Sequence, residues 1–383
     1  MPSPTLVSLL GGLTIGSVAK YIEWLNLFKK GQVKSKLPIS YVSLFSGIGG
    51  FELGIQKVFP FAQCVAFAEI EQQKIQIYKS HFPDHNNLGN VTDIPIGKLK
   101  TLKADLLVGG FSCVSKSSLS VMRGKATDQS FDTFEDTLRI LKYGQFSDVI
   151  LENVPTSYSS SLSTEQIVEK LEKVLGQKKK VSVIKVNGCN FTGTARNRVF
   201  FTTFIQNIPI PNMSQRFEFN LDPYEEVRRG FKDPDLDEFN LFLKEKLKEK
   251  NITKLDLNPF EYREFLVEFM NRETRTDRWS FTSDTNKKCS ATLTKKAGTY
   301  PNGFIIDRRG GDALVRYMTI GEGERLMGFP EGWLSSVGPT TGLRFLGDAV
   351  VVPVIQYIML NYLYERSKDK FKVYKPYKSY RGK

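Results

Sequence analysis

A lone cysteine follows a glycine pair in the stretch DLLVGGFSCVSKSS, Asp105–Ser118. The apolar run before the glycines has the composition of a buried strand, and open α/β sheets bind ligands beyond the carboxyl ends of their strands. A loop at that place offers free backbone N–H groups, which stabilise a thiolate, so Cys113 is a candidate nucleophile. Most free cysteines are buried and inert, but a position after the strand, not inside it, favours catalysis.

A carboxylate ends a second apolar run, DVILENVPTS, in which Glu152 and Asn153 follow the predicted strand. Partial burial raises the pKa of a carboxyl group toward the range where it shares a proton, although a simple strand-end cap is the alternative. A cysteine and a glutamate at the ends of two successive strands predict a nucleophile beside an acid.

Two arginines alternate at the start of another predicted strand, TARNRVFF. Arg196 and Arg198 on one side of an extended segment can hold a carbonyl oxygen and phosphates. A pair of surface charges is the alternative, and these residues alone do not decide between the two interpretations.

A glycine-rich turn, FSGIGGFELG, separates an apolar run that ends at Phe45 from a helical pattern. Gly47, Gly49 and Gly50 permit a tight turn and close backbone approach to a nucleotide, although glycines also mark ordinary turns. Glu69 ends the next predicted strand about 20 residues further on, the spacing of an acid that binds ribose hydroxyls. A solvated helix N-terminus also favours a carboxylate. The pattern fits NAD and S-adenosylmethionine equally.

The elements that must position these residues are short apolar runs that alternate with helical patterns. The runs are YVSLF, CVAFA, DLLVGG, DVILE, VSVIKVN and VFFTTF. In TEQIVEKLEKVLG, Ser163 and Gln166 form a capping box at the start of a helix that ends at Gly176. This alternation predicts an α/β fold, a Rossmann-like, mostly parallel sheet with helices on both faces.

The alternation stops near Phe204, which divides the chain into four predicted parts. They are an N-terminal extension (1–40), a nucleotide-binding domain (41–204), a smaller irregular, charge-rich domain (205–310) and a segment that returns to the large domain (311–383). The linker PIPNMSQRFEFNLDPYEE opens the smaller domain, in which Asn258, Pro259 and Glu261 predict a helix start. The apolar run AVVVPVIQYIMLNYLYERSK predicts the returning helix.

Composition points to a polyanionic partner. The 383 residues carry a net charge of +13, which favours nucleic acid over a merely soluble surface. Four scattered cysteines, Cys64, Cys113, Cys189 and Cys289, form no CxxC pair, so we expect no structural metal site and a reducing compartment without a disulfide scaffold. The apolar N-terminal run is too short and too rich in Gly, Ser and Thr to span a bilayer.

Together these motifs resemble those of the cytosine C5 methyltransferases, in the same order, from Tyr41 to about Tyr357. FSGIGGFELG resembles the family's first cofactor motif, AEIEQQ and GNVTDI its ribose and adenine segments, GGFSC its catalytic loop and TARNR its Arg-x-Arg motif. ENV, CSATLTKKAGTYPNGFI, RYMTIGEGERLMGFPEGW and LGDAVVVPV are similar to the remaining motifs. The resemblance implies a class I methyltransferase fold with a target recognition domain at 205–310.

The resemblance also implies roles for individual residues. Cys113 is the nucleophile toward cytosine C6, Glu152 supports N3, and Arg198 holds O2 with Arg196 nearby. The residues implied to bind S-adenosylmethionine are Phe45, Gly47, Ile48, Gly49, Gly50, Glu69, Ile70, Asn90 and Val91. No metal is implied. The expected function is methylation of cytosine C5 in a specific duplex DNA sequence, on a base flipped out of the helix.

Four positions depart from the family pattern. Ser112 and Val114 flank Cys113 where the family has proline and glutamine, Thr194 stands where glutamine is common, and Asp348 replaces an asparagine and puts a negative charge near the cofactor side. Because Cys113, Glu152 and both arginines are retained, we expect an active enzyme.

The alternatives are a tRNA cytosine-5 methyltransferase and a non-catalytic DNA-binding relative. An adenine N6 methyltransferase is disfavoured because the chain lacks an Asp/Asn-Pro-Pro-aromatic loop, and a dehydrogenase because no hydride-handling site is present. We expect double-stranded DNA as partner, a monomer on DNA, and a cognate restriction endonuclease as functional partner. The expected location is the cytoplasm, with the nucleoid, in a prokaryotic or viral setting.

Overall fold

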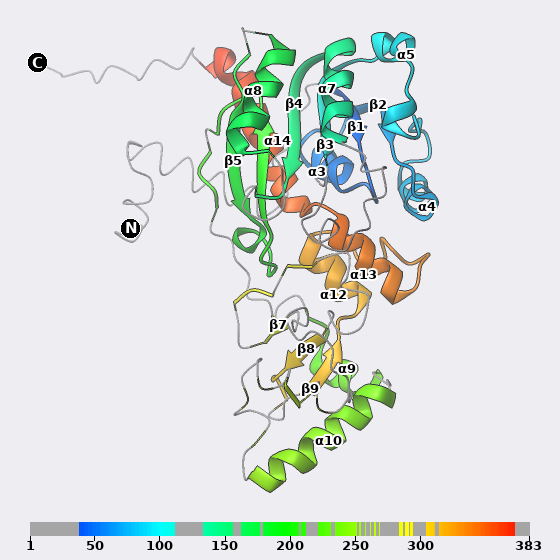
Figure 1. Cartoon of the computed structure of the whole chain (residues 1–383), viewed down its shortest axis with the longest axis vertical. Coiled ribbons are helices and arrows are strands. Elements are labelled where there is room, and N and C mark those ends of the chain that lie inside the picture. Colours follow the sequence, from blue (N-terminus) through cyan, green and yellow to red (C-terminus); the bar gives the residue numbers. More distant parts are fainter. Residues whose placement is uncertain are drawn as a thin grey trace, which may run out of the picture.

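The computed structural model (Figure 1) describes most of the chain. It describes residues 38–111, 133–155, 162–176, 179–206, 208–211, 221–230, 234–250, 283–285, 288–290, 292–293, 304–310 and 314–371, with isolated positions between 253 and 268. Cys113, nearly all of the predicted N-terminal extension, and Asn258 and Pro259 of the predicted helix start lie outside the described residues.

Six strands form one sheet in the order β2-β1-β3-β4-β6-β5. Their bounds are β1 Ser40–Leu44, β2 Gln63–Ala68, β3 Lys103–Gly110, β4 Gln145–Asn153, β5 Ser182–Asn187 and β6 Asn197–Thr202. The pairs β1–β2, β1–β3 and β3–β4 are parallel, whereas β6 runs antiparallel to both β4 and β5. The mostly parallel sheet is therefore confirmed. Its strand order reverses at β1, and ligands of such sheets bind beside that point at the carboxyl ends.

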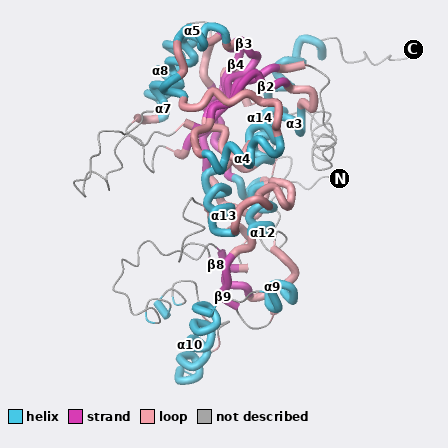
Figure 2. The backbone as a smooth tube through the Cα atoms, turned by 90° about the vertical axis from the view of Figure 1, so that its right-hand side faces the viewer, coloured by secondary structure: helices cyan, strands magenta, loops and turns pink. Residues whose placement is uncertain are grey.

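Helices cover both faces of this sheet (Figures 1 and 2). The helices α3 (Gly50–Val58), α4 (Gln72–His81) and α14 (Val352–Phe371) contribute to one apolar core, and α5 (Ile96–Thr101), α7 (Thr133–Tyr143) and α8 (Thr164–Leu175) to the other. Strand residues alternate between the two cores, as Leu106, Leu107 and Val108 of β3 show. This alternation follows from the two-residue period of a strand.

Local capping signals fix the ends of α8 as the sequence predicts. The Ser163 hydroxyl accepts a hydrogen bond from the Gln166 N–H (3.2 Å), and the Gln166 side chain accepts one from the Ser163 N–H (2.8 Å). The helix ends at Gly176, whose φ of 85° favours glycine. Capping boxes of this kind satisfy N–H groups that have no partner inside the helix.

The chain returns to the sheet through α12 (Ile320–Met327), α13 (Pro339–Asp348) and α14. A Cβ on Gly54 of α3 would lie 2.5 Å from the Ile355 Cβ of α14, so only glycine permits this close packing. The stretch Pro339–Arg366 is long and apolar enough to cross a membrane on length and composition, but 78% of its apolar 18-residue part is buried inside the protein. It therefore has the properties of a core helix.

A smaller lobe lies beyond α12, at the lower end of Figure 1. It contains α9 (Tyr224–Gly230), α10 (Pro234–Lys250) and a three-stranded sheet of β7 (Ser283–Asp284), β8 (Phe304–Asp307) and β9 (Leu314–Tyr317). Fully buried Arg316 of β9 pairs with Asp307 (3.0 Å) and with Glu322 of α12 (2.8 Å), which joins the lobe to α12. The predicted boundaries at 40, 204 and 310 stay a prediction.

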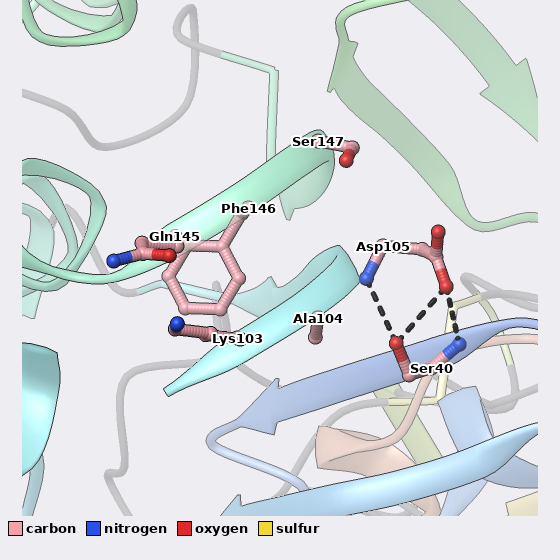
Figure 3. A pocket seen from close by; sticks show the side chains of 7 residues that line it. All are labelled: Ser40, Lys103, Ala104, Asp105, Gln145, Phe146 and Ser147. Carbon is pink, nitrogen blue, oxygen red and sulfur yellow. Dashed lines mark hydrogen bonds between the residues drawn. The ribbon is translucent and has the colours of Figure 1, made fainter. Parts of the chain in front are cut away.

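A shallow hollow of about 440 Å³ lies at the amino ends of β1, β3 and β4 (Figure 3). Asp105 accepts hydrogen bonds there from the Ser40 N–H (2.8 Å) and the Ser40 hydroxyl (2.9 Å). None of the predicted site residues lines this hollow. Its acid therefore serves to tie β3 to β1.

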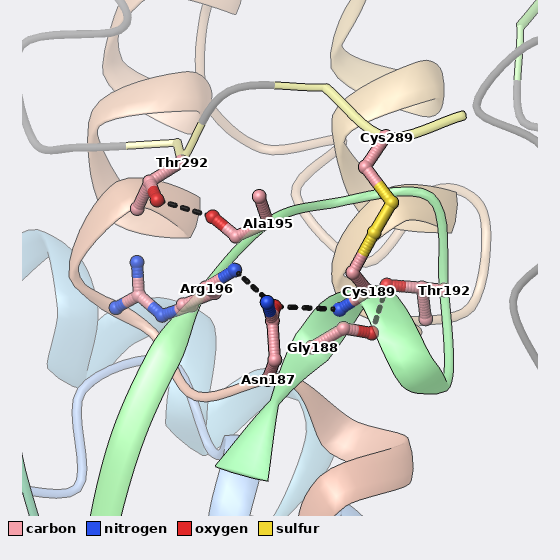
Figure 4. Close-up of a disulfide and its surroundings, with 8 residues drawn as sticks. All are labelled: Asn187, Gly188, Cys189, Thr192, Ala195, Arg196, Cys289 and Thr292. Carbon is pink, nitrogen blue, oxygen red and sulfur yellow. Dashed lines mark hydrogen bonds between the residues drawn. A yellow bond between two sulfur atoms is a disulfide. The ribbon is translucent and has the colours of Figure 1, made fainter. Parts of the chain in front are cut away.

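A disulfide joins Cys189 to Cys289 across 100 residues (Figure 4). Cys189 lies in a short 3-10 turn (η3, Gly188–Asn190) between β5 and β6, and the segment that carries Cys289 runs beside the same loop, where the Ala195 N–H donates to the Ser290 carbonyl (3.0 Å). The expectation of unpaired cysteines is therefore wrong for this pair. Sequence spacing did not reveal it because the contact forms only when the 288–293 segment returns to the sheet.

Candidate active site

A cleft of about 830 Å³ opens at the carboxyl ends of the parallel strands. It lies at the predicted end of the sheet, next to the reversal of strand order. Among the predicted site residues, those that line it are Phe45, Gly47, Ile48, Gly50, Glu69, Ile70, Asn90, Val91, Glu152, Arg196 and Arg198. Gly49 lies behind this lining, and Cys113 lies outside the described residues.

The glycine-rich turn between β1 and α3 forms one wall. Phe45, Gly47 and Gly49 all have positive φ angles, of 53°, 57° and 89°. Nothing lies within 4 Å of a Cβ built on Gly47, so the turn exposes its backbone to the cleft there, whereas a Cβ on Gly49 would lie 2.7 Å from the Phe82 ring. A non-glycine residue with positive φ, such as Phe45, is strained, and such residues cluster at ligand sites.

Glu69, at the end of β2, is held by backbone donors. Its carboxylate accepts hydrogen bonds from the N–H groups of Gly47 (2.9 Å), Ile70 (2.8 Å) and Glu71 (2.9 Å). The Asn87 side chain bonds both the N–H (3.2 Å) and the carbonyl (3.1 Å) of Glu69. A carboxylate has about four acceptor sites, so it can still accept from hydroxyl groups of a ligand. Asn87 could not be predicted, because its partner is the backbone of another segment.

Apolar surface lies beside this acid. The Ile70 side chain is 66% exposed and lines the cleft with Phe45 and Val91. A carboxylate for hydroxyl groups next to an exposed apolar side chain suits a nucleoside, whose sugar is polar and whose base has apolar faces. The residues present therefore fit an adenosyl group.

The two glycines at the end of β3 serve different neighbours. A Cβ on Gly109 would lie 2.7 Å from the Leu44 carbonyl oxygen of β1, and a Cβ on Gly110 would lie 3.0 Å from Glu152 Oε2. Gly109 thus allows close approach of the backbones, and Gly110 leaves room for the Glu152 carboxylate. Cys113 follows three residues later in the sequence.

Glu152 and Arg198 form an ion pair at the floor of the cleft. The Arg198 Nε lies 2.7 Å from Glu152 Oε1, and their side chains are 17% and 12% exposed. Glu152 is on β4 and Arg198 is on the neighbouring strand β6. The two strands pair antiparallel, with Glu152 opposite Phe200. A carboxylate and a guanidinium side by side present an acceptor and donors to one edge of a planar polar ring.

Arg196 lies in the loop between β5 and β6, close to the Cys189–Cys289 disulfide (Figure 4). It is 4% exposed, and its guanidinium donates to the carbonyls of Leu293 (2.8 Å) and Gly347 (3.1 Å). Burial, and then the charge of Arg198, lower the pKa of Arg196 to about 9. The two arginines are thus not equivalent: Arg198 lies beside the acid, and Arg196 ties β6 to the end of α13.

Another wall comes from the end of α13 and the two residues that follow it. Phe345, Gly347, Asp348, Ala349 and Val350 line it. Lys74 of α4 also lines the cleft. It could not be predicted, because it follows Glu69 within a polar helix that has no distinctive pattern. Among the described residues, no group of three or more His, Cys, Asp or Glu side chains is placed to hold a metal ion.

The sequence as a whole matches one protein family. The model of the family described as C-5 cytosine-specific DNA methylase matches residues 39–363. The type II methyltransferase M.Bsp6I of Bacillus sp. (strain RFL6) is 25% identical over 329 residues, which cover 84% of this chain and 98% of that protein. The type II methyltransferase M.FnuDI of Fusobacterium nucleatum is 27% identical over 351 residues, 87% of this chain and 96% of that protein.

A solved structure shares the fold. The Entamoeba histolytica methyltransferase EhMeth aligns with a TM-score of 0.61 at 15% identity, over 86% of this chain and 99% of that one. Since the family model extends over most of the chain, the chain belongs to the C-5 cytosine-specific DNA methylases and is a DNA cytosine-5 methyltransferase.

Proposed function

We propose that this enzyme transfers a methyl group from S-adenosylmethionine to C5 of cytosine within a specific duplex DNA sequence, through a covalent bond between Cys113 and cytosine C6. The observation that carries the proposal is the single cleft lined by both the Glu69 wall and the Glu152–Arg198 pair. A nucleoside-type subsite and a polar pair suited to a pyrimidine edge then share one space.

Carbon C5 of cytosine is a weak nucleophile, and the covalent bond to Cys113 makes it reactive. Attack of the Cys113 thiolate on C6 forms the C6–S bond and moves the C5–C6 electron pair onto C5. S-adenosylmethionine, when bound, supplies an electrophilic methyl group for that carbon. The C5 proton is then lost to solvent as the C6–S bond breaks, which restores the C5–C6 double bond and releases the Cys113 thiolate.

Glu152 and Arg198 bind the ring during this sequence. N3 and O2 are adjacent atoms of cytosine, and the 2.7 Å pair presents a carboxyl group and a guanidinium at adjacent positions. Glu152 hydrogen-bonds to or protonates N3 and so withdraws electron density from C6, which favours thiolate attack, while Arg198 donates to O2. The hydrogen bonds from the Arg196 guanidinium to the carbonyls of Leu293 and Gly347 hold the start of β6, and with it Arg198, in place. Arg196 itself does not contact the ring.

The remaining predicted residues hold the cofactor. Glu69 accepts from the ribose hydroxyls, and Ile70 packs on the adenine with Asn90 and Val91 at its edge. Phe45, Gly47, Ile48, Gly49 and Gly50 form the turn that cradles the rest of the molecule. The exposed Ile70 and the open space at Gly47 support this assignment.

The DNA must deliver a single base to the cleft. A cytosine inside a duplex is out of reach, so the base has to leave the stack at a cost of about a few kcal/mol. The net charge of +13 supports binding of the phosphates. The smaller lobe, which includes part of residues 205–310, then reads the surrounding bases in the major groove.

Methyl transfer to defined nucleic acids tests this proposal. We expect tritium from labelled S-adenosylmethionine in duplex DNA and not in tRNA, and bisulfite sequencing of DNA from expressing cells to show one protected sequence. The variant Cys113→Ala should lose transfer and keep cofactor binding. Label in tRNA alone, or transfer by Cys113→Ala at the wild-type rate, would contradict it.

A further inference from the structure

Four charged side chains alternate in sign along one edge of the cleft. We call them the rim cluster: Glu71, Lys74, Arg344 and Asp348. The Lys74 Nζ lies 3.1 Å from both Glu71 and Asp348, and the Arg344 guanidinium lies 2.7 Å from Glu71. Glu71, Lys74 and Asp348 line the cleft itself. The cluster therefore links α4 to α13, which lie close together in both Figure 1 and Figure 2.

The central lysine of the rim cluster is enclosed. The Lys74 side chain is 12% exposed, and its Nζ lies 5.4 Å from the centroid of the buried Phe345 ring. Arg344 lies over the same ring, at 4.6 Å. Cations over an aromatic face are attracted by its electrons. Phe345, itself part of the cleft lining, thus gives both cations a fixed place.

Lys74 and Asp348 each occupy an unfavourable end of their own helix. Lys74 is in the first turn of α4, where the helix dipole favours anions, and Asp348 is the last residue of α13, where it favours cations. Neither charge stabilises its helix, so local helix energetics do not account for either residue. Their 3.1 Å contact does account for both.

The environment of Lys74 is consistent with a permanent charge. Burial lowers the pKa of Lys74, but the carboxylates of Asp348, Glu69 and Glu71 more than offset this effect and raise the pKa above its ordinary value. The aspartate that replaces the family's asparagine therefore has a partner. Its negative charge is neutralised within the cleft wall.

We propose that Lys74 and Asp348 form an ionic clasp across the cofactor side of the cleft, which positions the two walls and slows dissociation of the bound cofactor. Lys74 and Asp348 are positioning residues, since they act by joining the walls. This inference rests on the proposed use of S-adenosylmethionine. It adds two residues, one of them a departure from the family pattern, to the machinery of this particular chain.

Cofactor dissociation from the full-length enzyme tests the clasp. The variants Asp348→Asn and Lys74→Met should each release S-adenosylhomocysteine about twofold to fivefold faster, the effect of losing an ion pair whose lysine is enclosed and whose aspartate is 41% exposed. The conservative variant Asp348→Glu should keep most of the wild-type rate, because it keeps a carboxylate for Lys74 without adding an acid beside Glu71. Calorimetry with S-adenosylmethionine and S-adenosylhomocysteine gives the matching affinities.

A matched control separates the clasp from general stability. Lys180→Met removes another lysine–glutamate pair, with Glu172 at 3.2 Å, away from the cleft, and should leave the rate unchanged. Asp348→Asn with an unchanged release rate, or Asp348→Glu that releases as fast as Asp348→Asn, would overturn the clasp while the proposed function stands. Wild-type enzyme that binds neither molecule would overturn the proposed function and the clasp with it.

Discussion

At the scale of residues, Glu152 is the side chain whose geometry supports its proposed role most directly. It lies in the cleft, 2.7 Å from Arg198 and close to the space that Gly110 leaves open. We expect Glu152→Gln to lower kcat about a hundredfold to a thousandfold, because general acids contribute about 10²–10⁴. Single-turnover methyl transfer measures this effect, with cofactor affinity unchanged.

Glu172→Gln is the matched control for that variant. Glu172 is an ion-paired glutamate on α8, away from the cleft, so its variant should keep the wild-type rate. Glu152→Gln with a rate within about twofold of wild type would show that the carboxyl group does not share a proton with the ring.

The glycine pair of β3 offers a second test at this scale. In Gly110→Ala, the new Cβ would lie 3.0 Å from Glu152 Oε2 and push the carboxylate from its place. We expect methyl transfer to fall about tenfold or more, since small misplacements of catalytic groups are costly. Gly97→Ala, which meets nothing within 4 Å, is the control and should leave activity unchanged. Equal activity of both variants would contradict this account of Gly110.

A buried acid outside the cleft makes stability depend on pH. Glu52 of α3 is fully buried, and burial raises its pKa to about 7, although the Ser43 hydroxyl opposes the rise. Below the ordinary pKa of 4.5, the Glu52 carboxyl group is protonated in both the folded and the unfolded state, so it does not change the free energy of unfolding. As pH rises from 4.5 to about 7, the unfolded chain gives up this proton while the folded state keeps it, so the free energy of unfolding falls by about 3 kcal/mol in total and changes no further above that range.

Urea unfolding of wild type and Glu52→Gln measures this effect. The variant stays neutral at all pH values, so we expect its stability relative to wild type to increase between pH 5.5 and pH 8. A difference between the two proteins that does not change with pH would show that Glu52 does not titrate in this range.

Many of the residues that line the cleft could be predicted, because their types and their positions after apolar runs are visible in the sequence. Glu69 and the glycine turn were identified by their spacing after strands, and they do share one cleft. Lys74 could not be paired with Asp348 in advance, since they lie 274 positions apart and contact only through the packing of α4 on α13. The different surroundings of Arg196 and Arg198 also needed the structure.

At the scale of elements, the Cys189–Cys289 bond ties the β5–β6 loop to the segment that leads out of the smaller lobe. Arg196, in the same loop, donates to the Leu293 carbonyl of that segment. We expect Cys289→Ser to lower the free energy of unfolding by about 2–4 kcal/mol, the usual effect of a disulfide that closes a long loop. Thermal unfolding without reductant measures it.

Reductant provides the control for this prediction. Dithiothreitol should lower the midpoint of the wild-type protein toward that of Cys289→Ser and should not affect the variant. A wild-type midpoint that is insensitive to reductant, and equal to that of the variant, would contradict a stabilising bond.

The positions of the strands and helices along the chain could be predicted better than the directions in which the strands run in the sheet. All six strands and the ends of α8 follow from apolar runs and capping residues. The antiparallel course of β6 was not predicted, although the short connection 188–196 leaves no room for a crossover, which needs about a dozen residues or more. Connection length was the available signal.

At the scale of the whole molecule, the cleft is built from both ends of the matched region. The glycine turn and Glu69 come from its start, and Asp348 and Val350 come from its end. The buried Arg316 pairs join α12, which precedes this end, to the smaller lobe. The arrangement of the lobes could not be predicted, because these contacts depend on charged side chains buried in pairs, which resemble ordinary surface charges in a sequence.

The central claim concerns a covalent bond between the enzyme and its target base. Fluorine at C5 cannot leave as a proton does, so duplex DNA with 5-fluorocytosine should trap the enzyme after methyl transfer, as an adduct that resists denaturation and maps to Cys113. We expect this adduct with the methyl donor, in the recognised sequence only, and none with Cys113→Ala. Methylation of ordinary cytosine without any trapped adduct, across a library of fluorinated sequence contexts, would contradict the account.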